Sequence, residues 1–581
     1  MSFSRFFPTK ERKPEAITTS IDLYAQAVIH EGSLEYTIAE GGNGSKPSYQ
    51  EASGAPVETH SPLGYHVGAI TIIFLNISKM IGTGIYSTPS SVLTGTGSVG
   101  LALLYWPLGF LISLSSLTVY LEYASYFPNR SGSEVVYLEQ AYPRPRYLFP
   151  VTFAIQTVIL SFSSSNAIVL AQYLYKINGH SPTDWEKKGV AVAGYTVAVL
   201  LVLFNTRFSF RLSNAIGIVK VITLVFIGIT GLVVLGGNTR VDDPTANFKD
   251  AFAGTTSSGY GVTNALYKII FSYAGYENSF NVVNEVKNPV KTLRTNAFLS
   301  LLIVAILYQL ANIAYFAAVS KADLEASTQV AASLFFTNVF GSSGAVRGLN
   351  FLIALSSFGN LLAVLLGTSR MLRECGRQGV LPFPRFWAST RPFGTPTGPY
   401  LVKWVMTLIM ILAPPAGDAF NFIVDLQVYP SALFAASMSI GLYIVRWRRR
   451  KAGIPRSEFR AWDIAVTFNI AANLFILIMP WYPPEPGQSD VSFWYATYVV
   501  VGIGIIVICV IYYYVWVHAL PKFKGYRLRQ ELLVLDNGAS SHRLVKVPVN
   551  ELAEWDKTHD LAGNRIEATS SNEKTGEHDF L

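Results

Sequence analysis

The chain has 581 residues and a formal net charge of +8; 50% of its residues are hydrophobic and only 14% are charged. Because a soluble domain usually carries roughly 25% charged residues, this composition indicates a membrane protein. Two cysteines are too few for a disulfide framework. The sequence has neither an H-E-x-x-H motif nor a G-x-x-x-x-G-K-[ST] loop, so it gives no support for zinc hydrolysis or P-loop chemistry. We expect no enzymatic activity, no metal and no cofactor.

Apolar stretches long enough to cross a hydrocarbon core, which takes about 20 helical residues, recur along the middle of the chain. The sequence therefore predicts an all-α membrane protein with twelve transmembrane helices. The ninth stretch is short, which leaves counts of eleven and thirteen open. The twelve stretches are residues 67–93, 99–126, 148–176, 187–205, 211–236, 260–285, 294–319, 347–374, 398–414, 418–445, 461–480 and 492–517.

Lysine and arginine in the connecting loops predict the orientation, because cytoplasmic loops carry an excess of them. When the first span starts in the cytoplasm, the inner loops hold most of these residues, with the densest group between Arg446 and Arg460. This pattern predicts a multi-pass plasma-membrane protein with both termini cytoplasmic. Since the topology accounts for the basic net charge, no nucleic-acid partner is expected.

The composition divides the chain into four regions. We expect a cytoplasmic N-terminal tail at 1–65, a transmembrane core of helices 1–10 at 66–445, helices 11–12 with a basic cytoplasmic loop at 446–518, and a cytoplasmic C-terminal tail at 519–581. The first tail is polar, and the second is charged and expected to be mostly solvated. Glu531–Leu535 and Val545–Trp555 could form short amphipathic pieces in the second tail.

The first span contains the sequence Ile81-Gly82-Thr83-Gly84-Ile85 near its middle. Each glycine costs about 1 kcal/mol in a helix, so the pair favours an unwound turn. Such a turn frees N–H groups at the start of the second half-helix, where the helix dipole favours an anion such as a carboxylate. A small-residue packing site between helices is the alternative.

The sixth span is interrupted in the same way by small and polar residues from Phe271 to Asn278. Free carbonyl groups at the end of its first half would receive a cation such as an ammonium group. Two broken spans five apart are typical of an inverted repeat in which spans 1–5 match spans 6–10. A pocket with adjacent carboxylate and ammonium sites suits a zwitterionic amino acid.

Four groups of residues resemble the signatures of the amino acid–polyamine–organocation superfamily. They are Ile81–Tyr86, Glu122–Pro128 with Ser131–Glu134, Asn284–Pro289, and Thr368–Arg370 with Gly379–Pro382. Within that superfamily the chain resembles the L-type amino acid transporter branch. It is most similar to fungal high-affinity methionine permeases, through Leu103–Trp106, Tyr137–Glu139, Phe271–Tyr276 and Phe280–Glu285.

The resemblance implies a LeuT-type 5+5 inverted repeat with broken helices 1 and 6, plus two extra C-terminal helices. It implies that backbone groups bind the substrate: the carboxylate at Gly82, Thr83, Gly84 and Ile85, and the ammonium at Phe271, Ser272 and Tyr273. Phe271 would also close over the substrate as a gate. The side-chain pocket would include Tyr276, Glu277 and Asn360.

Two of these side chains have alternatives. L-type exchangers usually carry Asn where Glu277 stands, which leaves open whether Glu277 faces the substrate. Asn360 could instead hydrogen-bond a neighbouring helix. Outside the pocket, Glu122 is expected to pair with a loop arginine, and Lys268 to lie near the outer interface.

Lys220 lies in the fifth span, roughly 14 Å into the bilayer when counted along the helix from Arg211. A charge at that depth costs at least about 2.5 kcal/mol, so a functional role is the default expectation. The resemblance implies that the Lys220 ammonium replaces the sodium ion of sodium-coupled relatives, close to Ser356 and Ser357, and couples transport to protons. A lysine that pairs statically or snorkels is the alternative.

The sequence therefore predicts a secondary active permease that imports neutral amino acids by proton symport with alternating access, with methionine-like substrates favoured. A sodium-independent exchanger and, less favoured, a transport-inactive sensor are the alternatives. The expected partners are an amino acid, a proton and the lipid bilayer. The loop Lys176–Lys188 has no cysteine that could bond a heavy chain. Lys10, Lys13 and Lys46 resemble ubiquitin-accepting tails of fungal permeases, so a ubiquitin-ligase adaptor is a candidate partner, and a plain solvated tail is the equal alternative.

Overall fold

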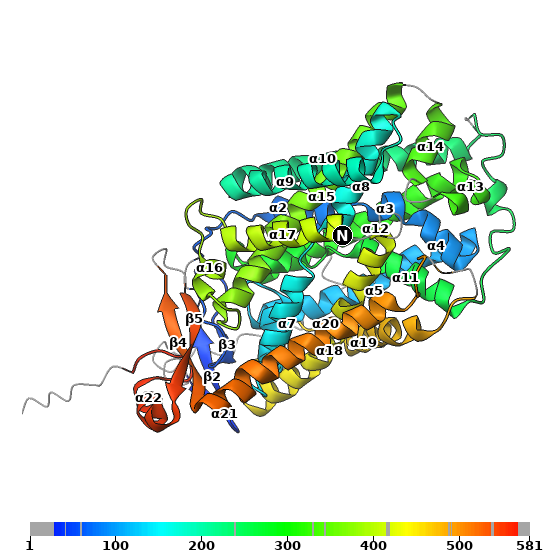
Figure 1. Ribbon diagram of the computed structural model, residues 1–581. Coiled ribbons are helices and arrows are strands. Elements are labelled where there is room, and N and C mark those ends of the chain that lie inside the picture. The colour runs from blue at the N-terminus through cyan, green and yellow to red at the C-terminus, as the bar shows by residue number, and fades with distance from the viewer. Residues whose placement is uncertain are drawn as a thin grey trace, which may run out of the picture.

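Long apolar helices make up most of the structure (Figure 1). The computed structural model describes residues 28–40, 42–58, 61–237, 240–327, 331–341, 344–413, 419–485, 489, 491–535 and 540–566. In this part of the chain, ten helical segments are long and apolar enough to cross a membrane. They are Ala69–Ser87, Val99–Tyr126, Leu148–Asn178, Asp184–Phe204, Thr206–Leu235, Pro289–Ala318, Gly344–Arg377, Asn421–Lys451, Asp463–Trp481 and Thr497–Lys524.

Each of the twelve apolar stretches corresponds to one or two observed helices. The sixth and ninth stretches form α11 (Gly259–Tyr273) and α17 (Thr397–Leu412), which have 15 and 16 residues and are too short to belong to the ten. The others form α2 (Ala69–Met80) with α3 (Gly84–Ser87), α5 (Val99–Tyr126), α7 (Leu148–Ile159) with α8 (Ser164–Asn178), α9 (Asp184–Phe204), α10 (Thr206–Leu235), α12 (Pro289–Ala318), α15 (Gly344–Arg377), α18 (Ala419–Lys451), α19 (Asp463–Ile478) and α20 (Thr497–Tyr514).

Local sequence signals account for several helix ends. Pro289 begins α12, where its missing N–H group is not needed. Thr183 and Glu186 form a capping box at the start of α9, and Gly179 ends α8 in the left-handed conformation. The short helices are α4 (Pro89–Thr96), α6 (Glu134–Ala141), α13 (Lys321–Ala326), α14 (Ala331–Phe340), α16 (Pro384–Ala388), α21 (Leu520–Lys524) and α22 (Leu552–Thr558).

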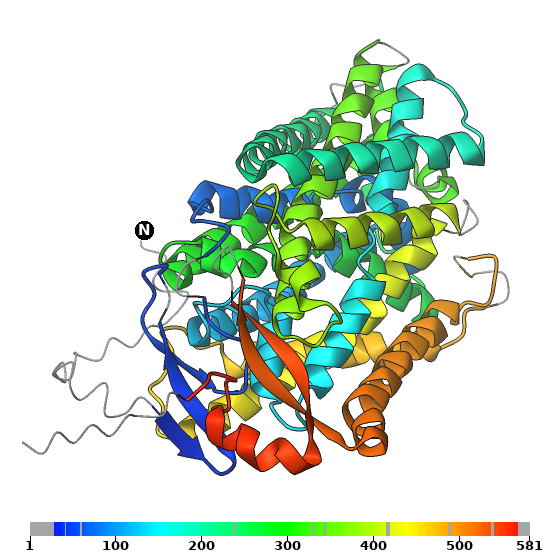
Figure 2. The same cartoon turned by 60° about the vertical axis from the view of Figure 1, so that its left-hand side comes forward.

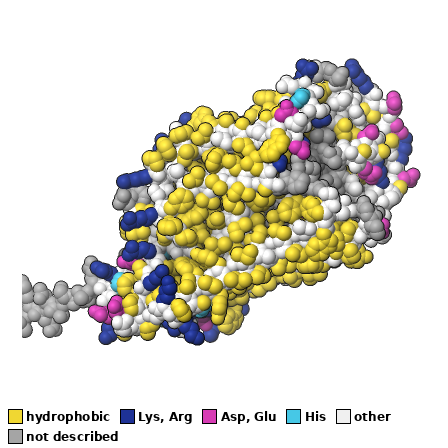
Figure 3. All heavy atoms as spheres, in the orientation of Figure 1, with side chains coloured by type: hydrophobic (Ala, Val, Ile, Leu, Met, Phe, Trp, Pro, Cys, Tyr) yellow, Lys and Arg dark blue, Asp and Glu magenta, His cyan; other side chains and the backbone are white. Residues whose placement is uncertain are grey.

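Hydrophobic side chains cover the middle of the face shown in Figure 3, while charged side chains gather toward its two ends. Large apolar residues are exposed along single helices, for example Ile222 and Ile229 of α10 and Leu104 and Leu111 of α5. An apolar band of this extent is typical of a surface that faces lipid rather than water. The surface therefore agrees with a protein that crosses a membrane several times.

The third predicted span, 148–176, contains an interruption that the sequence did not predict. Helix α7 ends at Ile159 and α8 begins at Ser164. Serine side chains compete for backbone hydrogen bonds, and this segment is rich in serine. Polar groups of α17 and α18 satisfy the freed backbone: Lys403 Nζ donates to Ser161 O (2.7 Å), Gln427 Nε2 to Phe162 O (3.1 Å), and Thr407 Oγ1 accepts from Ser163 N (3.0 Å).

In the residues described, both tails fold against the bundle, so the expectation of a mostly solvated second tail is wrong there. The first tail forms an antiparallel sheet in the order β1-β2-β3, and the second forms the hairpin β4-β5 followed by α22. The two sheets lie side by side at one end of the bundle, which we call the sheet face (Figures 1 and 2). The strands are β1 (Val28–Glu31), β2 (Leu34–Ala39), β3 (Ser48–Glu51), β4 (Tyr526–Val534) and β5 (Ser540–Pro548).

The two tails meet at the C-terminal end of α15. Arg377 donates through Nε to Ser540 O at 2.7 Å and through Nη2 to Pro56 O at 2.7 Å. The buried carboxylate of Glu58 lies 3.0 Å from Arg373 and 3.3 Å from Arg377. Burial alone would raise the pKa of Glu58, but the two guanidinium groups outweigh it and hold the pKa below its ordinary value. Glu58 is therefore a buried anion that joins the first tail to α15.

Two charged residues outside the pocket were also expected at particular places. Glu122 forms a 2.6 Å ion pair with Arg446, as predicted for a loop arginine. Lys268 does not reach the surface: it is fully buried and pairs with Asp425 of α18 at 2.8 Å. The carboxylate offsets part of the cost of burying the lysine charge in a dry interior.

The tail lysines are only partly described. Lys10 and Lys13 lie outside the described residues. Lys46 is exposed and pairs with Glu458 at 2.8 Å.

Candidate functional site

Two helices are interrupted inside the bundle, in the segments expected from the sequence. Helix α2 ends at Met80 and α3 begins at Gly84, so residues 81–83 lie outside both helices. Helix α11 ends at Tyr273, and a 3-10 helix begins at Asn278. Each interruption removes backbone groups from the helical hydrogen-bond pattern, and these groups need other partners in an apolar interior.

Glycine allows the two interruptions to touch. A Cβ atom on Gly84 would lie 2.8 Å from Ser272 Cα, which is closer than side chains tolerate. Gly275 has a φ of +144°, and a Cβ atom there would lie 2.7 Å from Met80 N. Both glycines are therefore needed for the close approach of α2–α3 to the end of α11.

The N–H groups of the first interruption differ in their availability. The N–H of Gly82 donates to Met80 O at 2.8 Å, so it is already used. Among the described backbone hydrogen bonds outside regular helices, none is donated by Thr83, Gly84 or Ile85. These three groups stand at the N-terminus of α3 followed by α4, where a helix end presents unpaired N–H groups. The first interruption therefore has three backbone N–H groups without a described acceptor.

Tyr308 of α12 holds the two interruptions together. Its hydroxyl donates to Met80 O at 2.6 Å and to Ser272 O at 2.9 Å. A hydroxyl has one proton, so it shares this proton between the two carbonyl groups. The Ser272 carbonyl, expected to receive an ammonium group, thus already has one partner.

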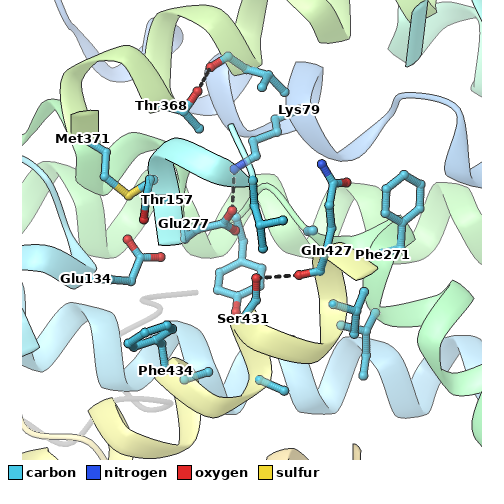
Figure 4. Close-up of a pocket in the computed structure, with 18 of the residues that line it drawn as sticks. Lys79, Glu134, Thr157, Phe271, Glu277, Thr368, Met371, Gln427, Ser431 and Phe434 are labelled. Carbon is cyan, nitrogen blue, oxygen red and sulfur yellow. Dashed lines mark hydrogen bonds and ion pairs between the residues drawn. The ribbon is translucent and has the colours of Figure 1, made fainter. Parts of the chain in front are cut away.

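A cavity of about 350 Å³ lies beside the two interruptions. Figure 4 shows Lys79 and Glu277 pointing toward each other, with Phe271 and Gln427 on one side and Glu134, Thr157 and Met371 on the other. The predicted residues that line the cavity are Gly82, Thr83, Gly84, Phe271, Tyr276, Glu277 and Asn360. These predicted residues therefore lie at one cavity, from both interrupted helices and from α15.

Other predicted residues do not line this cavity. Ile85 is fully buried. The Ser272 hydroxyl lies 3.0 Å from Thr88 Oγ1, at the junction of α3 and α4. The Tyr273 ring packs against Trp106 and Tyr308, with ring centroids 6.3 and 5.2 Å apart. Substrate contact through the backbone groups of these three residues stays a prediction.

Lys79, Glu134 and Lys403 line the cavity as well, although the sequence reasoning did not assign them to the site. Lys79 forms a 2.6 Å ion pair with the predicted Glu277, and the two side chains are only 16% and 15% exposed. Glu134 accepts a hydrogen bond from the Tyr120 hydroxyl. Lys79 and Lys403 each lie within a predicted span, so the rarity of intramembrane charge was a signal that could have identified them.

Lys220 lies behind the first interruption rather than in the cavity. Its ammonium group donates to Ser78 O at 2.7 Å and to Ile81 O at 2.6 Å. Ser356 donates to the same Ile81 carbonyl at 3.3 Å, whereas Ser357 is buried without a described hydrogen bond from its hydroxyl. Lys220 is 1% exposed, and no ion pair to it is found among the described residues. Its ammonium therefore supports the end of α2 through backbone carbonyl groups.

Asn360 of α15 contacts both the cavity and the first interruption. Its side-chain amide donates to Lys79 O. A Cβ atom on Gly82 would collide with the same amide. The helix contact expected as the alternative for Asn360 is thus present in the structure, while the residue also lines the cavity.

Residues 67–522 match the family described as amino acid permease, which is most of the chain. This chain belongs to the amino acid permease family. The predicted superfamily and the absence of an enzymatic role are thereby confirmed.

Relatives of this permease include two from Saccharomyces cerevisiae. The high-affinity methionine permease is 35% identical over 497 residues, which are 85% of this chain and 86% of that protein. The low-affinity methionine permease is 28% identical over 543 residues, covering 91% of this chain and 97% of that protein. The human cystine/glutamate transporter is 28% identical over 454 residues, covering 76% of this chain and 87% of that protein.

Gly84→Ala should reduce both substrate affinity and thermal stability of this permease. The added Cβ atom would force Ser272 away and separate the two interruptions. Gly68→Ala is the matched control, because a Cβ atom on Gly68 meets nothing within 4 Å. Binding of radiolabelled methionine and thermal unfolding in detergent measure the two effects. Equal affinities for the two variants would show that the close approach does not matter.

The Lys79–Glu277 pair should show strong coupling in a double-mutant cycle. Lys79→Met or Glu277→Gln alone leaves one largely buried charge without its partner, so each should destabilise the protein by about 3 kcal/mol. The double variant should cost less than the sum, by about 1–3 kcal/mol.

The exposed Lys249–Asp243 pair is the control for this cycle, because it has the same 2.6 Å separation but side chains 65% and 46% exposed. Its coupling in unfolding experiments should be small, because water and salt screen exposed charges. Coupling of the Lys79–Glu277 pair that is no larger than this would contradict a buried, interacting pair.

Proposed function

We propose that this permease imports neutral amino acids across the plasma membrane, with methionine-like substrates favoured. One observation carries the proposal: two interrupted helices meet at one cavity, whose lining includes Thr83 and Gly84. The 35% identity to a methionine permease supports the choice of methionine. Transporters use such half-helix ends to bind charged groups near the middle of the membrane.

The proposed architecture is a LeuT-type 5+5 inverted repeat of helices 1–10, followed by two further helices, twelve in all. The interruptions then belong to helices 1 and 6, and the core extends over 66–445, with helices 11–12 at 446–518. Tails 1–65 and 519–581 would both be cytoplasmic. The arginine-rich segment Arg446–Lys451 lies next to the folded tails. Because positively charged residues are enriched on the cytoplasmic side of a membrane, this location supports a cytoplasmic sheet face.

The substrate carboxylate would bind the N–H groups of Thr83, Gly84 and Ile85. Gly82 is removed from this set, because its N–H already donates to Met80 O. A carboxylate at a helix N-terminus gains charge-assisted hydrogen bonds and a favourable dipole interaction.

The substrate ammonium would bind carbonyl groups at the end of α11, at Phe271, Ser272 and Tyr273. A carbonyl oxygen has two lone pairs, so Ser272 O can accept a second donor beside Tyr308.

The remaining cavity suits an uncharged, apolar side chain. Ile112, Phe153, Phe162 and Met371 contribute apolar surface to the lining, and polarisable groups such as the Met371 thioether contact another thioether well. Glu277 is neutralised by Lys79, so the pair would not attract a charged substrate side chain. Phe271 would act as the gate, with Tyr276 and Asn360 completing the pocket.

Proton symport by alternating access is the proposed mechanism, with Lys220 as the coupling residue. When protonated, Lys220 donates to two carbonyl groups at the end of α2, and Ser356 adds a third hydrogen bond there. Loss of the proton would remove a charge-assisted donor from the first interruption and loosen it. Ser357 lies next to Ser356 on α15 and is proposed as a minor contributor to proton coupling.

A ubiquitin-ligase adaptor on the cytoplasmic tails is a further proposed partner. The exposed Lys46 would be one of the lysines that accept ubiquitin.

A competition panel in vesicles containing the purified permease tests the substrate class. Unlabelled methionine, leucine and phenylalanine should reduce uptake of radiolabelled methionine, whereas lysine and glutamate should not. Equal competition by lysine or glutamate would contradict a neutral pocket. Uptake only into vesicles preloaded with amino acid would identify an exchanger, and binding without any flux would identify a sensor.

Lys220→Met should abolish the stimulation of uptake by an inwardly directed proton gradient, while exchange of internal for external methionine continues. The reason is that exchange needs only the binding site, whereas accumulation needs the titrating group. Lys249→Met, at an exposed position, is the control and should behave like the unmodified protein. Undiminished gradient-driven accumulation in the Lys220 variant would refute the coupling role.

A further inference from the structure

A second, larger hollow lies at the sheet face, away from the substrate cavity. It has a volume of about 1080 Å³ and is bounded by α5, α12, α18, α19 and the loop 453–462. We call it the arginine groove. Neither the proposed transport cycle nor the tail contacts require a hollow at this position.

One part of the arginine groove is apolar and open. Its walls include Leu111, which is 51% exposed, and Ile464, which is 83% exposed. Phe298, Leu302 and Phe468 extend the same surface. Since these side chains belong to helices that cross the membrane, hydrocarbon chains are the natural contact for them.

The other part is strongly basic. Five arginines line it: Arg446, Arg449, Arg450, Arg456 and Arg460. Arg446 pairs with Glu122 and Asp463, and Arg460 with Asp463. The lining carboxylate Glu458 pairs with Lys46. Among the described residues, no carboxylate pairs with Arg449, Arg450 or Arg456.

Arg449 is the most informative of the three. It is only 8% exposed and lies over the Tyr126 ring, with its guanidinium carbon 4.4 Å from the ring centroid. One nitrogen donates to Tyr49 O at 2.8 Å, but the buried Nε has no hydrogen-bond partner in the described structure. A buried guanidinium with an unused donor and no counter-charge is costly unless an anion binds it.

We propose that the arginine groove binds one anionic phospholipid. The phosphate would lie against Arg449, Arg450 and Arg456, and the acyl chains would follow Leu111, Phe298 and Phe468 toward the membrane. Guanidinium groups bind phosphate by paired hydrogen bonds, and basic pockets between membrane helices on the cytoplasmic side select anionic head groups. A free phosphate ion would satisfy the arginines but would leave the apolar wall uncovered.

Native mass spectrometry of the full chain tests the proposal. The purified protein is incubated in detergent with phosphatidylserine, with phosphatidylcholine, or with inorganic phosphate. Retention of one phosphatidylserine, about tenfold or more above phosphatidylcholine, is expected. Equal retention of the two lipids, or phosphate that displaces phosphatidylserine at millimolar concentration, would overturn a specific lipid site.

Two pairs of substitutions locate the lipid. Arg450→Gln with Arg456→Gln should reduce the retained phosphatidylserine about tenfold, and both positions are exposed, so the fold should persist. Lys522→Gln with Lys524→Gln is the matched control, because it removes two charges at α21, outside the groove. Equal loss of phosphatidylserine in both double variants, or no loss in the Arg450→Gln, Arg456→Gln variant, would refute binding in the groove. Arg449→Gln tests the buried arginine separately.

Discussion

Backbone groups that leave a helix inside an apolar bundle must find new partners, and this requirement organises the centre of the permease. The carbonyl groups freed at the end of α2 are bound by Lys220, by Tyr308 and by the side-chain amide of Asn360. These residues come from three different helices, α10, α12 and α15. For the N–H groups at the start of α3, the described helices supply no such acceptor. A ligand with a carboxylate is the chemical complement of that remaining set.

Buried charged side chains also need partners in the apolar interior. Lys268 and Asp425 form a closed pair, and so do Lys79 and Glu277 at the cavity. Lys220 and Lys403 differ, because backbone carbonyl groups bind their ammonium groups and no carboxylate pairs with them among the described residues. The described interior therefore holds buried lysines of two kinds, those paired with a carboxylate and those bound only by backbone carbonyl groups.

The sequence predicted the two principal interruptions because glycine and small polar residues disfavour a continuous helix in an otherwise apolar span, and it predicted most helix ends within a few residues. It failed at Ser161–Ser163, where the break depends on Lys403, Thr407 and Gln427, which are distant in sequence. It also failed for the tails, since polar strands become ordered only through partners such as Arg373 and Arg377 at the end of α15. For Ser272 and Tyr273 the prediction concerned backbone carbonyl groups and stays a prediction; the sequence did not indicate that their side chains lie toward the junction of α3 and α4 and toward α12. Such orientation depends on tertiary packing, which a single sequence does not reveal.

The direct test of the central claim is a structure of the permease, produced with ordinary methionine, bound to L-selenomethionine. Selenium gives an anomalous signal that locates the substrate side chain independently of the protein. The account predicts one selenium peak in the cavity beside Phe271, with the substrate carboxylate within hydrogen-bonding distance of the N–H groups of Thr83 and Gly84. A selenium peak outside this cavity, or a carboxylate bound elsewhere while these N–H groups face protein atoms, would contradict it.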